Sequence, residues 1–262
     1  MTLPRIVAAE TLDGLAESDP AAIRSRSDLR RVHRAMGTRG IMLRALRGMA
    51  MTASAPMRVL ELGAGDGTLM LGVARALRRD WPGVELTLLD RQDLVGRSTV
   101  EAYAAAGWKA RARVADVLVW AADSSGDALP GQAPARWDLI VANLFLHHFE
   151  GAQLAALLGA IEGRSERFFA CEPRRARLAL AASHLVGALG ANAVTREDAV
   201  LSVHAGFQGA ELSALWPARG TAWGLGEYAA GLFSHCFCAQ RLDGAAPTDP
   251  AERRSFAHAE LL

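Results

Sequence analysis

The spacing of hydrophobic positions changes near residue 57 and divides the chain into two regions. Before that point, apolar side chains recur at helical spacing with a break at Gly37, and Asp28 is expected to cap one of the helices. Beyond it, short apolar runs alternate with helical stretches. This alternation is typical of a mostly parallel sheet with helices on both faces. The pattern predicts an α/β domain that follows a helical region.

Five apolar runs predict parallel strands, at residues 58–62, 85–90, 110–115, 139–143 and 167–172. Helical spacing between and after them predicts helices at residues 69–79, 95–106, 152–161 and 176–189. Residues 121–135 hold serine, glycine, aspartate and two prolines, which favours a surface loop. Residues 198–215 are expected to form a loop and a short helix.

Two further strands are expected near the end of the chain, at residues 223–230 and 232–241, on either side of Gly231. They must pair antiparallel, because a parallel return needs a longer crossover. The polar residues after Asp243 are expected to fray. The expected organisation is a helical lid at residues 1–55 with a hinge at 53–56, an α/β domain at residues 56–243 and a tail at residues 244–262.

Charge and cysteine content exclude several classes of protein. The 262 residues carry 29 basic and 28 acidic side chains, a net charge of +1, whereas proteins that grip many phosphates are strongly basic. We therefore expect no nucleic-acid partner. No apolar run approaches the length of a membrane span. Three cysteines are too few for a disulfide framework.

The N-terminal residues carry Glu10, Asp13, Glu17 and Asp19 and lack the basic start and apolar centre of a signal peptide. We expect a cytoplasmic protein. The sequence leaves its oligomeric state open, with a homodimer among the alternatives.

The strongest chemical signal is the segment VLELGAGDGT at residues 59–68, where a predicted strand enters a glycine-rich turn that opens a helix. Such a turn lets a ligand lie against bare backbone at the carboxyl end of the strand. A dinucleotide fingerprint needs a third glycine where this chain has Thr68. Glu61 would repel a pyrophosphate but suits a ligand that carries an ammonium and a sulfonium. Both residues oppose a nicotinamide-dependent reductase.

The segment ELGAGDG resembles the first motif of the class I S-adenosylmethionine-dependent methyltransferases, and the later motifs follow in that family's order from about residue 57 to 241. The resemblance implies a Rossmann-like, mostly parallel seven-stranded sheet of order 3-2-1-4-5-7-6, with the last strand antiparallel. It also implies S-adenosylmethionine as the cofactor. A glycine turn without a ligand is the alternative interpretation.

The resemblance also implies roles for single residues. The first-motif residues would surround the cofactor: Glu61, Gly63, Ala64, Gly65 and Gly67.

Asp90, with its neighbour Arg91, would lie at the ribose, where a carboxylate can accept hydrogen bonds from both hydroxyls. A strand-end cap is the alternative role of Asp90. Asp116 and Val117 match the adenine position. Asn143 and Leu144 match the segment that passes the methionine part and the methyl group.

Residues 138–149, DLIVANLFLHHF, are similar to the small-molecule branch that includes ubiquinone- and menaquinone-pathway and natural-product O-methyltransferases. In some of these enzymes a lid arginine meets the cofactor carboxylate, a role that would fall to Arg34; a solvated arginine is the alternative. The chain departs from enzymes that methylate nucleic-acid bases, because Asn143 is not followed by Pro-Pro-aromatic.

His147 and His148 follow the fourth predicted strand, close to where the family places the methyl group. An acceptor hydroxyl would be helped by a general base, and histidine titrates nearest neutral pH. We expect one of the two to point inward and act as this base; substrate packing or helix capping is the alternative. Cys236 and Cys238 share one face of a strand without a second ligand pair, so no metal site is expected.

Two further groups of residues stay open. Arg174 and Arg175 follow the fifth strand and would either contact an acidic acceptor or start a helix in solvent. Four aromatic side chains would line an acceptor cleft or pack in the core: Phe145, Phe149, Trp216 and Trp223.

These observations together predict an S-adenosylmethionine-dependent methyltransferase for a small molecule, with O-methylation of an aromatic, quinoid or polyketide-like acceptor as the expected reaction. Methylation at carbon or nitrogen of a similar acceptor is one alternative. A non-catalytic S-adenosylmethionine-binding subunit is another.

Overall fold

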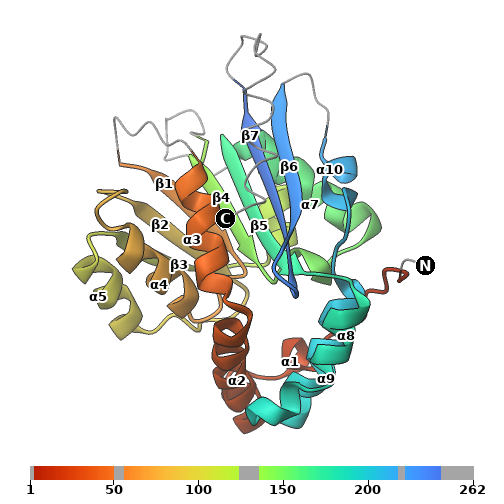
Figure 1. Ribbon diagram of the computed structural model, residues 1–262. Helices are drawn as coiled ribbons and strands as arrows, with labels where there is room; N and C mark the ends of the chain where they lie inside the picture. Colours follow the sequence, from red (N-terminus) through yellow and green to blue (C-terminus); the bar gives the residue numbers. More distant parts are fainter. Residues whose placement is uncertain (1–2, 50–55, 124–135, 218–221, 243–262) are drawn as a thin grey trace.

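The computed structural model describes residues 3–49, 56–123, 136–217 and 222–242. Within these residues, seven strands form one sheet that helices cover on both faces (Figure 1). The strands are β1 (Arg58–Leu62), β2 (Glu85–Asp90), β3 (Lys109–Val114), β4 (Leu139–Asn143), β5 (Arg167–Pro173), β6 (Trp223–Ala230) and β7 (Ser234–Arg241).

The α-helices are α1 (Thr11–Gly14), α2 (Pro20–Met36), α3 (Thr38–Gly48), α4 (Thr68–Leu77), α5 (Arg97–Ala105), α6 (Val117–Ala122), α7 (Gly151–Arg164), α8 (Arg177–Ser183), α9 (Ala193–Ala205) and α10 (Glu211–Leu215). Two short 3-10 helices complete the described elements, η1 (Leu146–His148) and η2 (Val186–Leu189).

The strand order β3-β2-β1-β4-β5-β7-β6 confirms the expected topology. Strands β1 to β5 are parallel, whereas β7 runs antiparallel to both β5 and β6. The reversal follows from the short turn between β6 and β7, where Gly231 has a φ of 69°. The expected second edge strand begins two residues late, at Ser234.

Side chains alternate between two hydrophobic layers, one on each face of the sheet. Val59 and Val141 point into the layer covered by α3, α4 and α5, whereas Leu60 and Ile140 point into the layer covered by α6, α7 and α10. This period of two is the geometry of a strand buried on both faces.

The helices α1, α2, α8 and α9 lie together beyond one end of the sheet (Figure 1). Helix α2 begins at Pro20 and is capped by the Asp19 carboxylate, which accepts a 2.7 Å hydrogen bond from the Ala21 N–H. The expected cap, Asp28, is wrong: it lies buried inside α2 and accepts a 2.7 Å hydrogen bond from the Asn192 N–H before α9. An Asp-Pro pair starts a helix well because proline loses no hydrogen bond at the first position.

Two helices were missed. Of residues 198–215, expected as a loop and a short helix, the last five form the short helix α10, whereas residues 198–205 belong to α9. Helix α9 begins at Ala193, where the Asn192 side chain caps it by accepting a 2.8 Å hydrogen bond from the Thr195 N–H. Its hydrophobic pattern is weak because it is packed among α1, α2 and α8 rather than lying on one core. Helix α6 follows β3 directly, and its last two residues lie in the segment expected as a surface loop.

Helix α3 falls within the range expected for the lid, but it belongs to the core of the sheet domain. Its Met42 and Leu46 are fully buried and pack in the same layer as the β1 and β4 side chains. Gly37, with a φ of 68°, ends α2 and lets the chain turn into α3, as the sequence indicated. The expected hinge at 53–56 and the expected tail lie largely outside the described residues.

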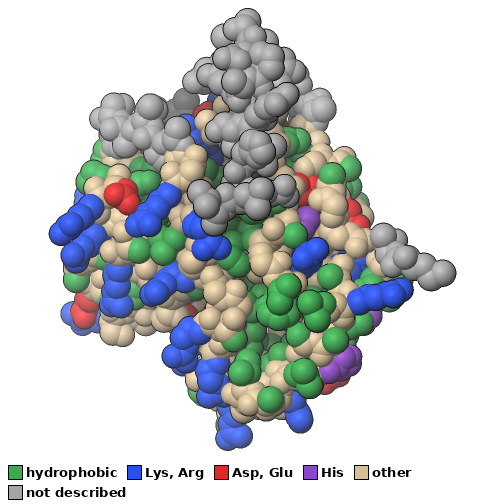
Figure 2. Space-filling model, in the orientation of Figure 1, with side chains coloured by type: hydrophobic (Ala, Val, Ile, Leu, Met, Phe, Trp, Pro, Cys, Tyr) green, Lys and Arg blue, Asp and Glu red, His purple; other side chains and the backbone are tan. Residues whose placement is uncertain are grey.

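Figure 2 shows hydrophobic side chains gathered on the lower part of the molecule in that view. Independently of the picture, several exposed hydrophobic side chains belong to the helices beyond the sheet end. They include Ile23 of α2, Leu178 of α8 and Leu189 of η2. Lys and Arg side chains stand mostly apart from one another on the same face (Figure 2). Among the described helices, none combines the length and the apolar character that a membrane crossing needs.

The core position of α3 generates a stability prediction. Met42→Ala should lower the free energy of unfolding by about 2–5 kcal/mol, because it leaves a cavity between α3 and the sheet. Ile23→Ala removes a helical side chain that is 55% exposed and should change the same quantity by less than about 0.5 kcal/mol. Urea unfolding of both variants measures the difference; equal effects would place α3 outside the core.

Candidate functional site

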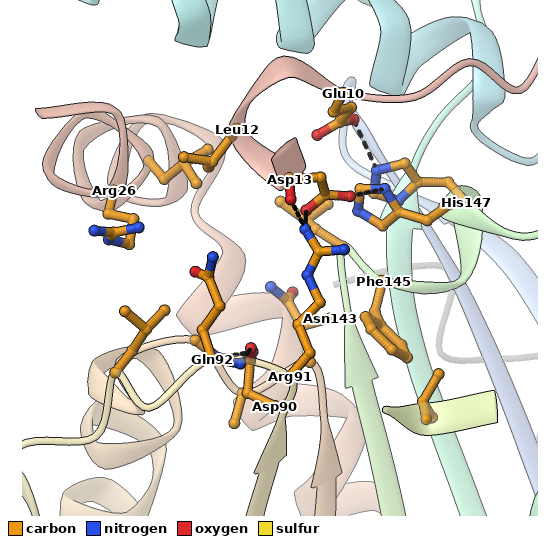
Figure 3. A pocket seen from close by; sticks show the side chains of 18 of the residues that line it. Glu10, Leu12, Asp13, Arg26, Asp90, Arg91, Gln92, Asn143, Phe145 and His147 are labelled. Atoms are coloured by element: carbon orange, nitrogen blue, oxygen red, sulfur yellow. Dashed lines mark hydrogen bonds and ion pairs between the residues drawn. The ribbon is translucent and has the colours of Figure 1, made fainter. Parts of the chain in front are cut away.

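A cavity of about 730 Å³ opens at the carboxyl ends of β1, β2 and β4, between the sheet and the helices beyond it (Figure 3). Its lining comes from the turn after β1, the ends of β2 and β4, helix α2, and the N-terminal segment, defined here as residues 7–14. Carboxyl ends of parallel strands are where open α/β sheets bind ligands. The cavity also lies in the size range of small-molecule sites.

The glycine turn has the geometry that its sequence predicts. Gly63, Gly65 and Gly67 have φ values of 67°, 55° and 72°, which only glycine adopts easily. Gly63 also touches an aromatic ring, because a Cβ there would lie 2.2 Å from Phe145. Gly63, Ala64 and Gly65 line the cavity, whereas Gly67 opens helix α4.

Glu61 is the most unusual group of this turn. Its side chain is buried, with 3% of the residue exposed, and its Oε2 atom has no hydrogen-bond partner. Burial, together with the nearby Asp90 and Asp66 carboxylates, raises the pKa of Glu61 to about 8. A buried carboxylate without a partner is costly unless a cation or donor is supplied from outside. The arrangement fits a ligand that brings an ammonium group.

The ends of β2 and β3 supply further polar groups. The Asp90 carboxylate accepts hydrogen bonds from the Gly65 N–H at 2.8 Å and the Gln92 N–H at 3.0 Å. Arg91 lines the cavity and is paired with Asp13 of the N-terminal segment (Figure 3). Asp116 lines the cavity too, while its carboxylate caps α6 through the Leu118 N–H at 2.7 Å.

Val117 lies beside Asp116 in the cavity wall, so the structure brings this expected pair together with the glycine turn.

The chain turns sharply after β4. Asn143 lines the cavity, and its buried Oδ1 atom has no partner. Leu144 has a φ of 49°, a left-handed conformation that costs roughly 1–2 kcal/mol for a residue with a Cβ. Such strain persists only where the surroundings over-determine it, and it concentrates at functional sites.

Glu172 at the end of β5 provides that over-determination. The residue is fully buried, and its carboxylate accepts hydrogen bonds from the backbone N–H groups of Phe145, Leu146 and His147 at 2.9–3.3 Å. The same carboxylate lies 2.8 Å from His147 Nδ1. It therefore caps the 3-10 helix η1 and holds the turn after β4.

The structure places both histidines in the cavity wall, although only one was expected to point inward. In a 3-10 helix, adjacent side chains are about 120° apart, so both can line a concave surface. His147 Nε2 lies 3.3 Å from Glu10 Oε1, and its other nitrogen contacts Glu172. His148 Nδ1 lies 3.3 Å from Asp13 Oδ2.

The environments of the two imidazoles differ. Burial disfavours the charged form of His147, but its hydrogen bonds to Glu10 and Glu172 outweigh burial and raise the pKa of His147 to about 9. Burial and the charge of His147 lower the pKa of His148, against the opposing effect of Glu10, Asp13 and Glu172. His147 is therefore an imidazolium at neutral pH and His148 is neutral.

Glu10, His147 and His148 each place a ligand-type atom within 4.8 Å of the other two, a spacing that could also hold a metal ion. The sequence predicted no metal site. In this structure both ring nitrogens of His147 contact carboxylates, Glu172 and Glu10, and His148 Nδ1 lies near Asp13. We therefore interpret the cluster as a hydrogen-bonded network.

Helix α2 contributes one face to the cavity through Arg26, Leu29, Arg30 and His33. Arg30 pairs with Asp66 of the glycine turn at 2.8 Å. The Nε2 atom of His33 is buried without a partner, and burial lowers the pKa of His33 to about 4. Arg34 lies one position beyond this face; it is exposed, and its Nε donates to the Arg30 carbonyl.

Of the residues whose role the sequence left open, Arg174, Arg175, Trp216 and Trp223 lie outside the cavity lining. Arg175 is buried and donates to the Leu3 carbonyl at 2.9 Å, so it does not start a helix in solvent. Trp216 and Trp223 pack with each other in the second hydrophobic layer. Phe145 and Phe149, in contrast, both line the cavity, and their rings meet edge to face with centroids 5.3 Å apart.

Two of the cysteines, Cys171 and Cys236, are buried opposite each other on β5 and β7, and Cys238 is half-buried.

Comparison with known proteins gives a result at the level of fold. No protein-family model matches the chain, and no curated protein matches its sequence. Among solved structures, the plantazolicin methyltransferase BpumL with SAH matches with a TM-score of 0.58 at 13% identity, over 86% of this chain and 92% of that one. BamL, another plantazolicin methyltransferase, matches with a TM-score of 0.55 at 12% identity, over 88% and 93%.

An O-methyltransferase family protein from Burkholderia thailandensis matches with a TM-score of 0.55 at 17% identity, over 86% of this chain and 62% of that one. With the strand order already described, these likenesses decide the architecture. The chain has the class I methyltransferase fold. At these identities the likeness extends to the fold and not to the acceptor.

Sequence reasoning missed the carboxylates that hold the histidines. Glu172 gave a signal, because an acidic residue interrupts the apolar strand FFACEP. Glu10 and Asp13 gave none, because more than 130 residues separate them from the histidines. Their positions depend on how the N-terminal segment packs.

The contact between Gly63 and Phe145 generates a second prediction. Gly63→Ala and Gly65→Ala both place a Cβ at a left-handed φ, which costs roughly 1–2 kcal/mol. Only the Gly63 variant also drives a Cβ into the Phe145 ring, whereas a Cβ at Gly65 meets open space. Gly63→Ala should therefore lower the free energy of unfolding further, by about 1–3 kcal/mol. Chemical denaturation of both variants measures this, and equal losses would contradict the described turn.

Proposed function

We propose that this protein is an S-adenosylmethionine-dependent methyltransferase that acts on a small molecule, and that the acceptor atom is a hydroxyl oxygen on an aromatic, quinoid or polyketide-like compound. The observation that carries the proposal is the buried Glu61 carboxylate, whose free Oε2 atom lies at the end of β1 beside the glycine turn. Carbon and nitrogen acceptors and a non-catalytic binding subunit remain alternatives for the experiments below.

The polar groups of the cavity fit this cofactor. Glu61 would accept from the ammonium group, and the backbone of Gly63 to Gly65 gives room for the amino-acid part. Asp90 would accept from the ribose hydroxyls, with Arg91 beside it, and Asp116 and Val117 would border the adenine. Asn143 would bind through its free Oδ1 atom, with Leu144 next to it. Acidic residues in the lining outnumber arginines, which suits a cationic ligand.

Helix α2 would close the amino-acid end of the cofactor. His33 and Arg30 belong to the face of α2 that lines the cavity, so they are better placed than Arg34 to meet the cofactor carboxylate. The role assigned to Arg34 from the resemblance is therefore proposed for its neighbours instead.

The acceptor would lie at the other end of the cavity, between η1 and the N-terminal segment. Phe145 and Phe149 offer apolar faces there, and His147 and His148 offer the only imidazoles of that end among the described lining residues. An aromatic acceptor would pack on these rings. A neutral histidine there would serve a hydroxyl that must lose its proton.

The cofactor supplies an electrophilic methyl group bonded to a sulfonium. The protein's contribution is to hold the two reactants in line and to exclude water from the reacting atoms. The N-terminal segment and α2 perform the second task, because they roof the carboxyl ends of the strands. We also propose a small-molecule partner without nucleic acid, and the cytoplasm as the location.

Calorimetric titration with S-adenosylmethionine tests the proposal. We expect one molecule to bind per chain and NAD to give no heat. Glu61→Gln should weaken binding at least about tenfold, because a charge-assisted hydrogen bond contributes roughly 1.5–3 kcal/mol. Asp80→Asn, a change of an exposed acid outside the cavity, should leave the affinity unchanged. NAD binding without S-adenosylmethionine binding would overturn the proposal.

Proton release on binding gives an independent test. The carboxyl of Glu61 holds a proton below about pH 8 in the free protein, and an ammonium partner requires the ionised form. Binding should therefore release close to one proton between pH 6 and 7, and the affinity should rise with pH in this window. Titrations in two buffers of different ionisation enthalpy count the proton; an affinity that is flat from pH 6 to 7 would contradict the role of Glu61.

A further inference from the structure

We propose, resting on the methyl transfer proposed above, that His148 is the general base oriented by Asp13, and that His147 is a charged positioning residue held between Glu10 and Glu172. The acceptor half of the site is then completed by two carboxylates from the N-terminal segment. The acceptor class is a weakly acidic hydroxyl, as in a phenol.

His147 cannot accept a proton in this geometry. Both of its ring nitrogens face carboxylates, Nδ1 at 2.8 Å from Glu172 and Nε2 at 3.3 Å from Glu10. Each contact requires an N–H donor, so the ring carries both protons. The residue is 2% exposed, and its backbone N–H is bound to the same Glu172 carboxylate. The ring is therefore fixed as an imidazolium.

His148 has the complementary arrangement. Its Nδ1 atom lies 3.3 Å from Asp13 Oδ2, so we assign the proton of the neutral ring to this nitrogen. Nε2 is then the nitrogen with a free lone pair. The ring lines the cavity and makes an edge contact with Phe145, with the two ring centroids 6.4 Å apart. A histidine whose second nitrogen is oriented by a carboxylate is the arrangement that general-base catalysis uses.

Charged groups face His148 from each of its sides. His147 lies in the same 3-10 helix, with ring centroids 4.2 Å apart, and Glu172 lies beneath on β5. Glu10 and Asp13 approach from the N-terminal segment, and Arg91 after β2 pairs with Asp13. The imidazolium of His147 opposes a second positive charge, which keeps His148 neutral and ready to take a proton.

The N-terminal segment is fixed in place by the rest of the fold. The Arg5 side chain, just before it, donates to the Ala205 carbonyl at 2.8 Å and the Phe149 carbonyl at 2.9 Å. The N–H groups of Thr11 and Leu12 donate to the Asp198 carboxylate of α9 at 2.8 and 3.0 Å. Glu10 and Asp13 are therefore positioned by α9 and η1, on the side of the cavity that the cofactor residues leave free.

The acceptor oxygen forms a bond to the methyl carbon while the carbon–sulfur bond breaks and its electron pair goes to sulfur. The acceptor's proton goes to His148 Nε2, and His148 then returns it to solvent. A phenol suits this base, because a neutral imidazole removes a proton far more easily from a phenol than from an aliphatic alcohol.

Nitrogen NMR of the histidine rings tests the proposal without an acceptor. In protein labelled at histidine nitrogens and bound to S-adenosylhomocysteine, His147 should keep protons on both nitrogens up to about pH 8. His148 should be neutral at pH 7 with its proton on Nδ1. Asp13→Asn should alter the His148 signals and leave those of His147 in place. A neutral His147, or a His148 proton on Nε2, would overturn the proposal.

Kinetics with a panel of alkyl-substituted phenols supplies the second arm. His148→Gln should lower kcat by about 10²–10⁴-fold with the cofactor affinity unchanged. His147→Gln should move the acidic limb of the kcat/KM profile to higher pH, because removing the imidazolium lets His148 hold a proton more strongly. His184→Gln, an exposed histidine change, is the matched control.

Positioning by Asp13 predicts a loss in kcat for Asp13→Asn and partial recovery for Asp13→Glu, since a longer carboxylate can still accept from Nδ1. If His147→Gln removes the acidic limb of the kcat/KM profile and His148→Gln keeps it, the roles of the two histidines are reversed and the proposal is wrong. Activity that is lost on chelation and restored by Zn²⁺ would instead make the cluster a metal site. Failure of S-adenosylhomocysteine to bind the wild-type protein would count against the proposed function, whereas the ring signals of the free protein still report on the histidines.

Discussion

The site depends on one buried carboxylate. Glu172 lies fully buried near the end of β5, where an ionised group is stable only if its acceptor sites are filled. Three backbone N–H groups and the His147 ring fill them. These bonds fix the turn after β4, including the strained Leu144, and thereby fix where Phe145 and both histidines stand. Glu172 thus supplies the contacts that tie the start of η1 to the end of β5.

Two buried glutamates therefore have different roles at the cavity. Glu172 has its acceptor sites occupied by the protein, so it acts as a structural anchor. Glu61 is similarly buried but has a free oxygen, and burial together with the nearby Asp90 and Asp66 carboxylates raises its pKa. A protein gains nothing in stability from such a group, so its presence at a ligand cavity is best explained by a ligand that supplies the partner. Glu172 is therefore explained by the fold, whereas Glu61 is explained by the proposed ligand.

The fold could be predicted from the sequence, and the residues proposed for the cofactor could be selected from it, because both depend on local patterns. Strand periodicity, the glycine spacing and the acids at strand ends lie within a few residues of the groups they position, as with Gly63 and Asp90. The acceptor half depends on contacts between distant segments. Glu10 meets His147 only because α9 and η1 seat the N-terminal segment, and helix α9 itself has a weak pattern. Such contacts leave no spacing to detect.

The packing of the N-terminal segment also means that the two halves of the cavity depend on different parts of the fold. The cofactor half is built on strands whose register is fixed by the sheet. The acceptor half is roofed by a segment held through a few side-chain bonds, among them Arg5 to Phe149 and Asp198 to Thr11. These bonds are partly buried and Asp198 is only 6% exposed, so the segment is anchored to the body of the protein. Two of the three carboxylates that contact the histidines, Glu10 and Asp13, belong to that segment, whereas Glu172 belongs to β5. The proposed acceptor half therefore forms only where the N-terminal segment, η1 and the sheet meet.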